Sequence, residues 1–308
     1  MMTFPPLRLA TRSSPLALWQ ANFVADRLRP VCAPRPVTLV HVETHGDRDR
    51  ATALSSMGGF GVFTKAIQQS LLDGRADLAV HSLKDLPTIP TPGVILAAVP
   101  LRGATGDVFL SRTVKRFDDL PQGATIGTSS IRRRAMMANR RPDLKLVDLR
   151  GNVDTRIRKL DEQQLDGIVL AEAGLVRLGL AERITERLDP EWMLPAVGQG
   201  AIGLECREFD SETKHFAEAL TDPESFARVL AERAFLAALG GGCLVPIGAK
   251  SAVMKATLTL RGIVLSPDGV RKIVATHCGP LSSPLAVGQE LAGILLDEGA
   301  AALLPAPV

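Results

Sequence analysis

The chain has 308 residues, of which 46% are hydrophobic and 22% are charged. This length exceeds one ordinary hydrophobic core, so two or three globular domains are expected. A net charge of +3, the absence of tyrosine and only two tryptophans argue against a general nucleic-acid binder, which needs strong positive charge and aromatic surfaces for the bases.

The basic residues are mostly arginine, because only nine of the 36 are lysine. A guanidinium group presents a planar fork that matches a carboxylate or phosphate, whereas lysine is a point charge. The bias therefore fits a small acidic ligand. It equally fits the codon usage of a high-GC genome.

The four cysteines, Cys32, Cys206, Cys243 and Cys278, are far apart and form no CxxC pair, so neither a zinc site nor a disulfide framework is expected. The first residues lack the basic and apolar parts of a signal peptide, and no apolar run approaches the length of a membrane span. We therefore expect a cytoplasmic protein that needs no metal.

The beginning of the chain predicts a strand, a turn and a helix. An apolar run at 7–11 is followed by Arg12, and then Ser14 and Pro15 suit the N-cap and first position of a helix over 16–28. The free backbone N–H groups at such a helix start favour an anion beside Arg12.

A predicted strand at 77–81 ends immediately before a charged pair. Ligands of parallel α/β sheets bind at the carboxyl ends of the strands, which is where this strand places Lys84 and Asp85. An ordinary surface ion pair is the alternative. The preceding glycine-bearing segment 46–61 lacks hydrophobic periodicity, which fits a lid over a site.

Arginines also follow predicted strand ends in the middle of the chain, where strands are expected at 125–127, 144–149 and 166–171. A solvated surface would scatter arginines along exposed helix flanks, whereas a site for a small polyacid collects them at strand-to-helix junctions. The arginines at such junctions are Arg12, Arg132, Arg133, Arg150, Arg156 and Arg177.

The last part of the chain predicts a smaller α+β domain. Residues 194–207 combine hinge-like glycines with an apolar strand that would return the chain to the first sheet. Strands at 255–265 and 270–277 flank a Ser-Pro-Asp-Gly turn, and a closing helix is expected at 285–298. We predict a first lobe at 1–101 and 200–218, a second lobe at 102–199 and a C-terminal domain at 219–308.

A predicted helix at 223–239 ends in three consecutive glycines, followed by Cys243 and then by Pro246. Glycines end the helix, and the proline keeps the chain from re-entering a regular element at once. The pattern predicts a thiol displayed on a short loop. A buried, inert cysteine is the alternative.

Six segments together resemble the porphobilinogen deaminase family, whose members are also called hydroxymethylbilane synthases. Each segment alone would be a weak signal, but the six occur in the family's order over nearly the whole chain. The segments are ATRSSPLA at 10–17, HSLKDLP at 81–87, GTSSIRR at 127–133, LRGNV at 149–153, LPAVGQG at 194–200 and GGGC at 240–243.

The resemblance implies an α/β fold with two periplasmic-binding-protein-like lobes plus a small α+β C-terminal domain. It implies a transferase of porphyrin and heme biosynthesis that joins four porphobilinogen molecules head to tail, releases ammonia and yields hydroxymethylbilane. The product is built on a dipyrromethane cofactor that is bound through a thioether to Cys243. The family is usually monomeric, so a cytoplasmic monomer without nucleic-acid or membrane partners is expected.

The resemblance also implies residue roles. Asp85 is the expected catalytic acid, because a carboxylate beside a pyrrole N–H can stabilise positive charge and move protons. Besides Cys243, the cofactor-binding residues implied are Lys84, Ser14, Thr128, Ser129, Ser130, Arg132, Arg133, Arg150 and Gly151. The substrate-binding residues implied are Arg12, Arg156, Arg177 and Gln199.

One departure from the family pattern is Phe60, which stands where the glycine loop normally carries lysine. Altered lid behaviour is therefore expected, with the acid and the anchor unaffected. Two other readings of the residues stay open: a non-catalytic bilobal protein that binds a small polycarboxylate, and an acyl-transfer enzyme that uses Cys243 as its nucleophile. The second lacks an evident histidine partner.

Overall fold

A computed structural model describes residues 4–43, 64–241 and 245–304. The expected lid at 46–61, with Phe60, and the expected anchor Cys243 lie outside the described residues. The chain divides into two compact units. Unit 1 consists of residues 1–103 and 201–226, and unit 2 of residues 104–200 and 227–308.

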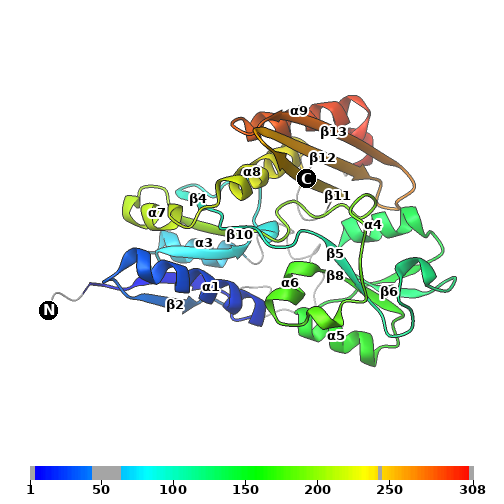
Figure 1. Ribbon diagram of the computed structural model, residues 1–308, viewed down its shortest axis with the longest axis horizontal. Coiled ribbons are helices and arrows are strands. Elements are labelled where there is room, and N and C mark those ends of the chain that lie inside the picture. Colours follow the sequence, from blue (N-terminus) through cyan, green and yellow to red (C-terminus); the bar gives the residue numbers. More distant parts are fainter. Residues whose placement is uncertain (1–3, 44–63, 242–244, 305–308) are drawn as a thin grey trace. The chain divides into compact units, whose positions relative to one another are not determined.

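Unit 1 is built on a five-stranded mixed sheet with the order β2-β1-β3-β10-β4 (Figure 1). Strand β1 (Leu7–Thr11) pairs in parallel with β2 (Val37–His41) and β3 (Leu78–Ser82). The returning strand β10 (Ile202–Arg207) is antiparallel to β3 and to β4 (Val94–Ala98). The expected return of the chain to the first sheet is confirmed.

Three helices accompany this sheet: α1 (Pro15–Cys32), α3 (Lys65–Leu72) and α7 (Ser211–Glu218). The side chain of Ser14 accepts a hydrogen bond from the backbone N–H of Ala17, so the predicted cap at the start of α1 is confirmed. The helix runs beyond the predicted end at residue 28, because Leu28 and Cys32 still bury their side chains in the core of unit 1.

Unit 2 contains a second five-stranded mixed sheet with the order β7-β6-β8-β5-β9. Strand β6 (Thr125–Gly127) is parallel to β7 (Lys145–Val147) and β8 (Gly167–Ala171). Strand β5 (Asp107–Leu110) is antiparallel to β8 and to β9 (Glu186–Arg187). As in unit 1, one antiparallel strand separates three parallel strands from a fifth strand at the edge of the sheet.

Each parallel strand of this second sheet is followed closely by a helix. These helices are α4 (Ile131–Arg140), α5 (Val153–Glu162) and α6 (Glu172–Arg177). Ser130 caps α4, since its hydroxyl oxygen accepts from the backbone N–H of Arg133. The expected strand-to-helix junctions of unit 2 are therefore confirmed, and Arg132 and Arg133 lie in the first turn of α4.

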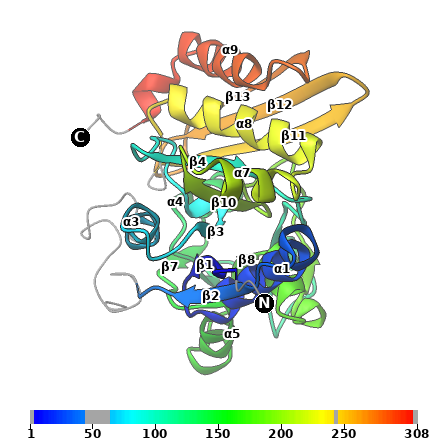
Figure 2. The ribbon, with the colours of Figure 1, turned by 90° about the vertical axis from the view of Figure 1, so that its left-hand side faces the viewer.

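Unit 2 also contains a three-stranded antiparallel sheet, β11 (Ile247–Met254), β12 (Thr257–Leu265) and β13 (Lys272–Pro280). Helices α8 (Pro223–Ala238) and α9 (Pro284–Asp297) lie over it (Figure 2). The α/β class with a smaller C-terminal sheet is thus confirmed. The three-domain boundaries stay a prediction, because the third sheet belongs to the same compact unit as the second.

No helix within the described residues is long and apolar enough to cross a membrane. The core of each unit is instead formed by sheet residues and the apolar faces of the helices packed on them. Examples are Leu9 and Val24 in unit 1, and Phe109 and Met137 in unit 2.

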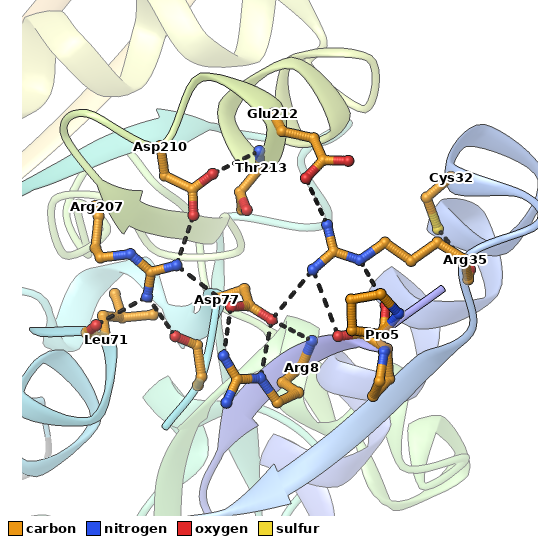
Figure 3. Close-up of polar contacts among 12 residues, drawn as sticks. Pro5, Arg8, Cys32, Arg35, Leu71, Asp77, Arg207, Asp210, Glu212 and Thr213 are labelled. Carbon is orange, nitrogen blue, oxygen red and sulfur yellow. Dashed lines mark hydrogen bonds and ion pairs between the residues drawn. The ribbon is translucent and has the colours of Figure 1, made fainter. Parts of the chain in front are cut away.

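A buried carboxylate ties three parts of unit 1 together at the amino end of β3 (Figure 3). Asp77 accepts hydrogen bonds from the backbone and the guanidinium group of Arg8 and from Arg207, and it lies 3.7 Å from Arg35. Arg207 also pairs with Asp210, just before α7, and Arg35 pairs with Glu212 in α7. We call these six residues the Asp77 cluster; its three cations and three anions balance.

We predict that Asp77→Asn will lower the free energy of unfolding by about 3 kcal/mol, because it leaves guanidinium groups without their carboxylate. Burial alone would raise the pKa of Asp77, but hydrogen bonds from Arg8 and Arg207 outweigh it and hold this pKa below its usual range. The stabilisation is therefore present at neutral pH and is lost as the pH falls through the folded-state pKa.

Urea unfolding at pH 7 measures this difference. Asp118→Asn, at the partly exposed ion pair with Arg140, is the matched control and should cost less than about 1 kcal/mol. Equal losses in the two variants would contradict the prediction.

Candidate functional site

The turn after β3 presents the charged pair found in the sequence. Residues Leu83–Asp85 form one turn of 3-10 helix, in which Leu83 donates its N–H to Ala201 and Leu86 donates back to Leu83. Lys84 and Asp85 are both half-buried in this turn. The expectation that they lie at the carboxyl end of a strand is confirmed.

A glutamine on α1 holds the residue before this turn. Gln20 is 2% exposed, and its side-chain amide donates to the hydroxyl of Ser82 at 2.9 Å and accepts from it at 3.1 Å. Helix α1 follows β1, and the turn follows β3. Because β1 and β3 are parallel neighbours, this contact links the segments that follow both strands. Arg12 and Ser14 lie at one junction, and Asp85 lies at the other.

A second buried polar group beneath the turn was not found from the sequence. Nε2 of His81 lies 3.0 Å from Oε2 of Glu205, and Gln68 of α3 donates to both carboxylate oxygens. All three side chains are buried. These contacts join β3, β10 and α3.

In unit 2, the hydroxyl residues at 128–130 connect two strand ends. The hydroxyl of Ser129 donates to the carbonyl of Leu149 and accepts its N–H, at 2.9 and 3.1 Å. Thr128 accepts from the N–H of Ser130, which in turn caps α4. The segments GTSSIRR and LRGNV therefore lie next to each other, although about twenty residues separate them in the chain.

Arg132 and Arg133 at the start of α4 share one buried carboxylate, that of Asp107. Nη1 of Arg132 lies 2.7 Å from one oxygen of Asp107, and Nη2 of Arg133 lies 2.7 Å from the other. Gln199 donates to the same carboxylate and to the carbonyls of Thr105 and Gly106. We call Asp107, Arg132, Arg133 and Gln199 the Asp107 cluster; Asp107 is the member that the sequence reading missed.

The remaining predicted arginines of unit 2 lie before or within the two other helices: Arg150 precedes α5, Arg156 lies in its first turns and Arg177 is the last residue of α6. Gly151 has φ of +115°, a backbone conformation that favours glycine, and its carbonyl accepts from Nε of Arg156. Arg150 precedes it and is half-buried. Arg177 at the end of α6 donates to the carbonyl of Gly200 at 2.6 Å, and burial lowers its pKa to about 10.

The described residues on each side of Cys243 fit a chain that leaves a helix abruptly. Helix α8 ends at Ala238, and Gly240 has φ of +64°. A Cβ on Gly241 would lie 2.6 Å from Leu236, so this position accepts only glycine without displacing that side chain. The exposure of the thiol itself stays a prediction.

The donor set suits an anion with several carboxylates. Guanidinium groups, hydroxyls and the N–H groups of a capped helix occur together at the junctions of unit 2, and Nε of Arg132 is buried without a hydrogen-bond partner in the described part of the chain. No three His, Cys, Asp or Glu side chains among the described residues gather so as to hold a metal ion.

Comparison with known proteins gives two family matches. The model of the porphobilinogen deaminase, dipyromethane cofactor binding domain, matches residues 7–215, and that of the porphobilinogen deaminase, C-terminal domain, matches residues 226–297. A porphobilinogen deaminase of Syntrophotalea carbinolica is 48% identical over 305 residues, which cover 99% of this chain and 97% of that protein.

Solved structures with similar folds include two binding proteins. An ABC transporter periplasmic substrate-binding protein from Coxiella burnetii is 14% identical, with a TM-score of 0.44, and the match covers 73% of this chain and 96% of that chain. A nutrient binding protein from Burkholderia cenocepacia, solved with methionine, is 13% identical, with a TM-score of 0.43, and covers 71% and 93%.

We predict that Gly203→Ala will disturb the Asp85 turn without unfolding the chain. A Cβ at this position of β10 would lie 2.6 Å from Cδ1 of Leu83, so that side chain has to move. Amide hydrogen exchange of Leu83 and Leu86 should become faster by about tenfold, which corresponds to about 1.4 kcal/mol of local opening free energy.

The matched control is Gly293→Ala in α9, where an added Cβ meets no atom within 4 Å. Alanine is the better helix former there, so exchange at Leu83 should not change. Unchanged exchange at Leu83 in both variants would contradict the prediction, because the turn would then tolerate a Cβ at position 203.

Proposed function

The chain belongs to the porphobilinogen deaminase family, and from this premise we propose which of its residues perform each part of the family's reaction. The enzyme is a transferase of tetrapyrrole biosynthesis. It condenses four porphobilinogen molecules head to tail, releases ammonia at each condensation and yields the linear tetrapyrrole hydroxymethylbilane. It uses a covalently bound dipyrromethane cofactor.

Cys243 is the proposed attachment point, through a thioether. When bound, the dipyrromethane supplies the pyrrole to which the first porphobilinogen unit is joined. The end of helix α8 at Ala238 and the positive φ of Gly240 support this role, because the chain leaves the helix a few residues before the thiol. Cys32 and Cys206 are less suited, because both are buried and burial raises the pKa of Cys206 to about 11.

The arginines provide the proposed carboxylate sites. Every pyrrole unit carries an acetate and a propionate, so the bound chain gains negative charge with each condensation. The observation that carries this proposal is that arginines precede or lie within all three helices that follow the parallel strands of unit 2. Arg132, Arg133, Arg150 and Gly151 are assigned to the cofactor, together with Thr128, Ser129 and Ser130, and Arg156, Arg177 and Gln199 to the substrate.

Unit 1 contributes the proposed acid and further contacts. Asp85 is assigned to the reacting pyrrole, with Lys84 and Ser14 on cofactor carboxylates and Arg12 on substrate carboxylates. Loss of ammonia from porphobilinogen leaves positive charge shared with the ring nitrogen. The Asp85 carboxylate stabilises this charge through the N–H group and accepts the proton that leaves the ring when the new bond is complete.

We further propose that the enzyme acts as a monomer in the cytoplasm, without nucleic-acid or membrane partners. The cysteines in the described residues are all free, which fits a reducing compartment. The small net charge and the scarcity of aromatic residues fit the absence of a nucleic-acid partner.

The first test of these assignments is intact mass. The unchanged protein should be heavier than its polypeptide by one dipyrromethane and should give colour with an aldehyde reagent for pyrroles. Cys243→Ser should have the bare polypeptide mass, whereas Cys278→Ser, at an exposed cysteine, should keep the added mass. Added mass on the Cys243→Ser variant would reject the proposed anchor.

The second test concerns Asp85. Asp85→Asn keeps the size of the side chain but cannot accept a proton, so kcat for porphobilinogen consumption should fall by at least about 10²-fold. Asp85→Glu keeps a carboxylate and should retain more activity than the Asn variant. If Asp85→Asn turned over porphobilinogen within about tenfold of the unchanged enzyme, the assignment of the proton acceptor would be wrong.

A further inference from the structure

We propose that Asp107 is a positioning residue, which holds the arginines of unit 2 in the arrangement that binds the carboxylates of the cofactor and growing chain. This inference rests on the proposed function, but it assigns Asp107 no contact with the ligand. Asp107 acts through Arg132, Arg133 and Gln199, and the two arginines have different parts in the site.

The side chains of the ion-pair network are almost fully removed from solvent. The side chain of Asp107 is 0% exposed, and those of Arg132 and Arg133 are 5% and 6% exposed. Both arginines approach the carboxylate at 2.7 Å, one at each oxygen. In such surroundings an ion pair is weakly screened, so the positions of the two guanidinium groups are coupled to that of Asp107.

The network has an excess of positive charge, because one carboxylate serves two guanidinium groups. Burial would raise the pKa of Asp107, but the charges of Arg132 and Arg133 hold it below its usual range, so Asp107 is ionised at neutral pH. Burial lowers the pKa of Arg132, and the charge of Asp107 opposes this effect. A ligand carboxylate would supply the missing negative charge.

The two arginines differ in which of their N–H groups have hydrogen-bond partners in the described part of the chain. Arg133 uses Nε and Nη2 on Asp107 and Nη1 on the carbonyl of Val169. Arg132 uses Nη1 on Asp107 and the carbonyl of Leu194, while its buried Nε has no partner in the described part of the chain. Arg133 is therefore held to β5 and β8 by Asp107 and Val169, whereas Arg132 keeps one donor, Nε, that no group in the described part of the chain satisfies.

Gln199 extends the network to a further arginine. Its amide donates to Asp107 at 3.0 Å and to the carbonyls of Thr105 and Gly106. The next residue, Gly200, accepts from Arg177 through its carbonyl. Asp107 thus fixes Arg132 and Arg133 directly and influences Arg177 through the backbone after Gln199.

A purely structural ion pair would have the same distances, and the Asp77 cluster is an example within this chain. Asp77 also contacts several arginines, but two further acids balance those arginines, and the cluster lies at the amino end of β3, away from the Asp85 turn along that strand. The two aspartates are therefore a matched pair: both hold arginines, and only Asp107 holds arginines assigned to the ligand.

The experiment compares Asp107→Asn with Asp77→Asn. The holoenzyme fraction is measured by intact mass, the melting temperature by calorimetry, and KM and kcat with porphobilinogen are expressed per molecule that carries the cofactor. Both variants should melt at lower temperature. Asp107→Asn alone should lower the holoenzyme fraction and raise KM by about tenfold, with kcat per loaded molecule within about threefold of the unchanged enzyme.

Equal KM and equal loading in the two variants would overturn the proposal, whether both matched the unchanged enzyme or both departed from it. If Asp107→Asn does not fold, crystal structures of the unchanged holoenzyme before and after addition of porphobilinogen decide the matter. Arg133 should remain within hydrogen-bond distance of Asp107 in both, and loss of this contact in either structure would overturn the proposal.

These outcomes are separate from failure of the proposed function. An unchanged chain that carries no added mass and consumes no porphobilinogen would reject the function itself. Normal loading and turnover of the unchanged chain, with Asp107→Asn behaving like Asp77→Asn, would reject only the positioning role.

Discussion

A cation that is buried to receive an acidic ligand has to be held in place before the ligand arrives. In unit 2 the guanidinium groups of Arg132 and Arg133 share one buried carboxylate, Asp107, which we propose meets this requirement. Desolvating these groups is costly, and the cost is recovered only when each charge has a partner at good geometry. The arrangement of β5, β8 and α4 around Asp107 follows from this constraint.

The sequence predicted where helices start better than it predicted which residues contact one another in the fold. Ser14 with Pro15, and Ser130 before α4, carry local capping signals, so the helix starts could be found without any knowledge of the fold. The rule that ligands bind at the carboxyl ends of parallel strands placed Asp85 correctly, because it depends only on strand order. The helix ends were less accurate, as the extension of α1 to Cys32 shows.

The residues that hold the site could not be found in this way, because their partners are distant in the chain. Asp107 contacts side chains 25 to 92 positions later, and Glu205 contacts Gln68 across 137 positions. Each is a single acid at or inside an apolar strand, which in sequence resembles an ordinary charged strand residue. One feature of the sequence could have pointed to Asp107. A buried arginine needs an acid, and Asp107 is an acid that directly precedes the apolar residues of β5.

The order of strands in unit 1 has a consequence for synthesis on the ribosome. Strand β10 lies between β3 and β4, yet it is made only after the whole 104–200 segment of unit 2. Until residues 202–207 emerge, β4 has no neighbour in its sheet and β3 has an open edge. The nascent amino-terminal part therefore remains an incomplete sheet with exposed backbone groups until that point.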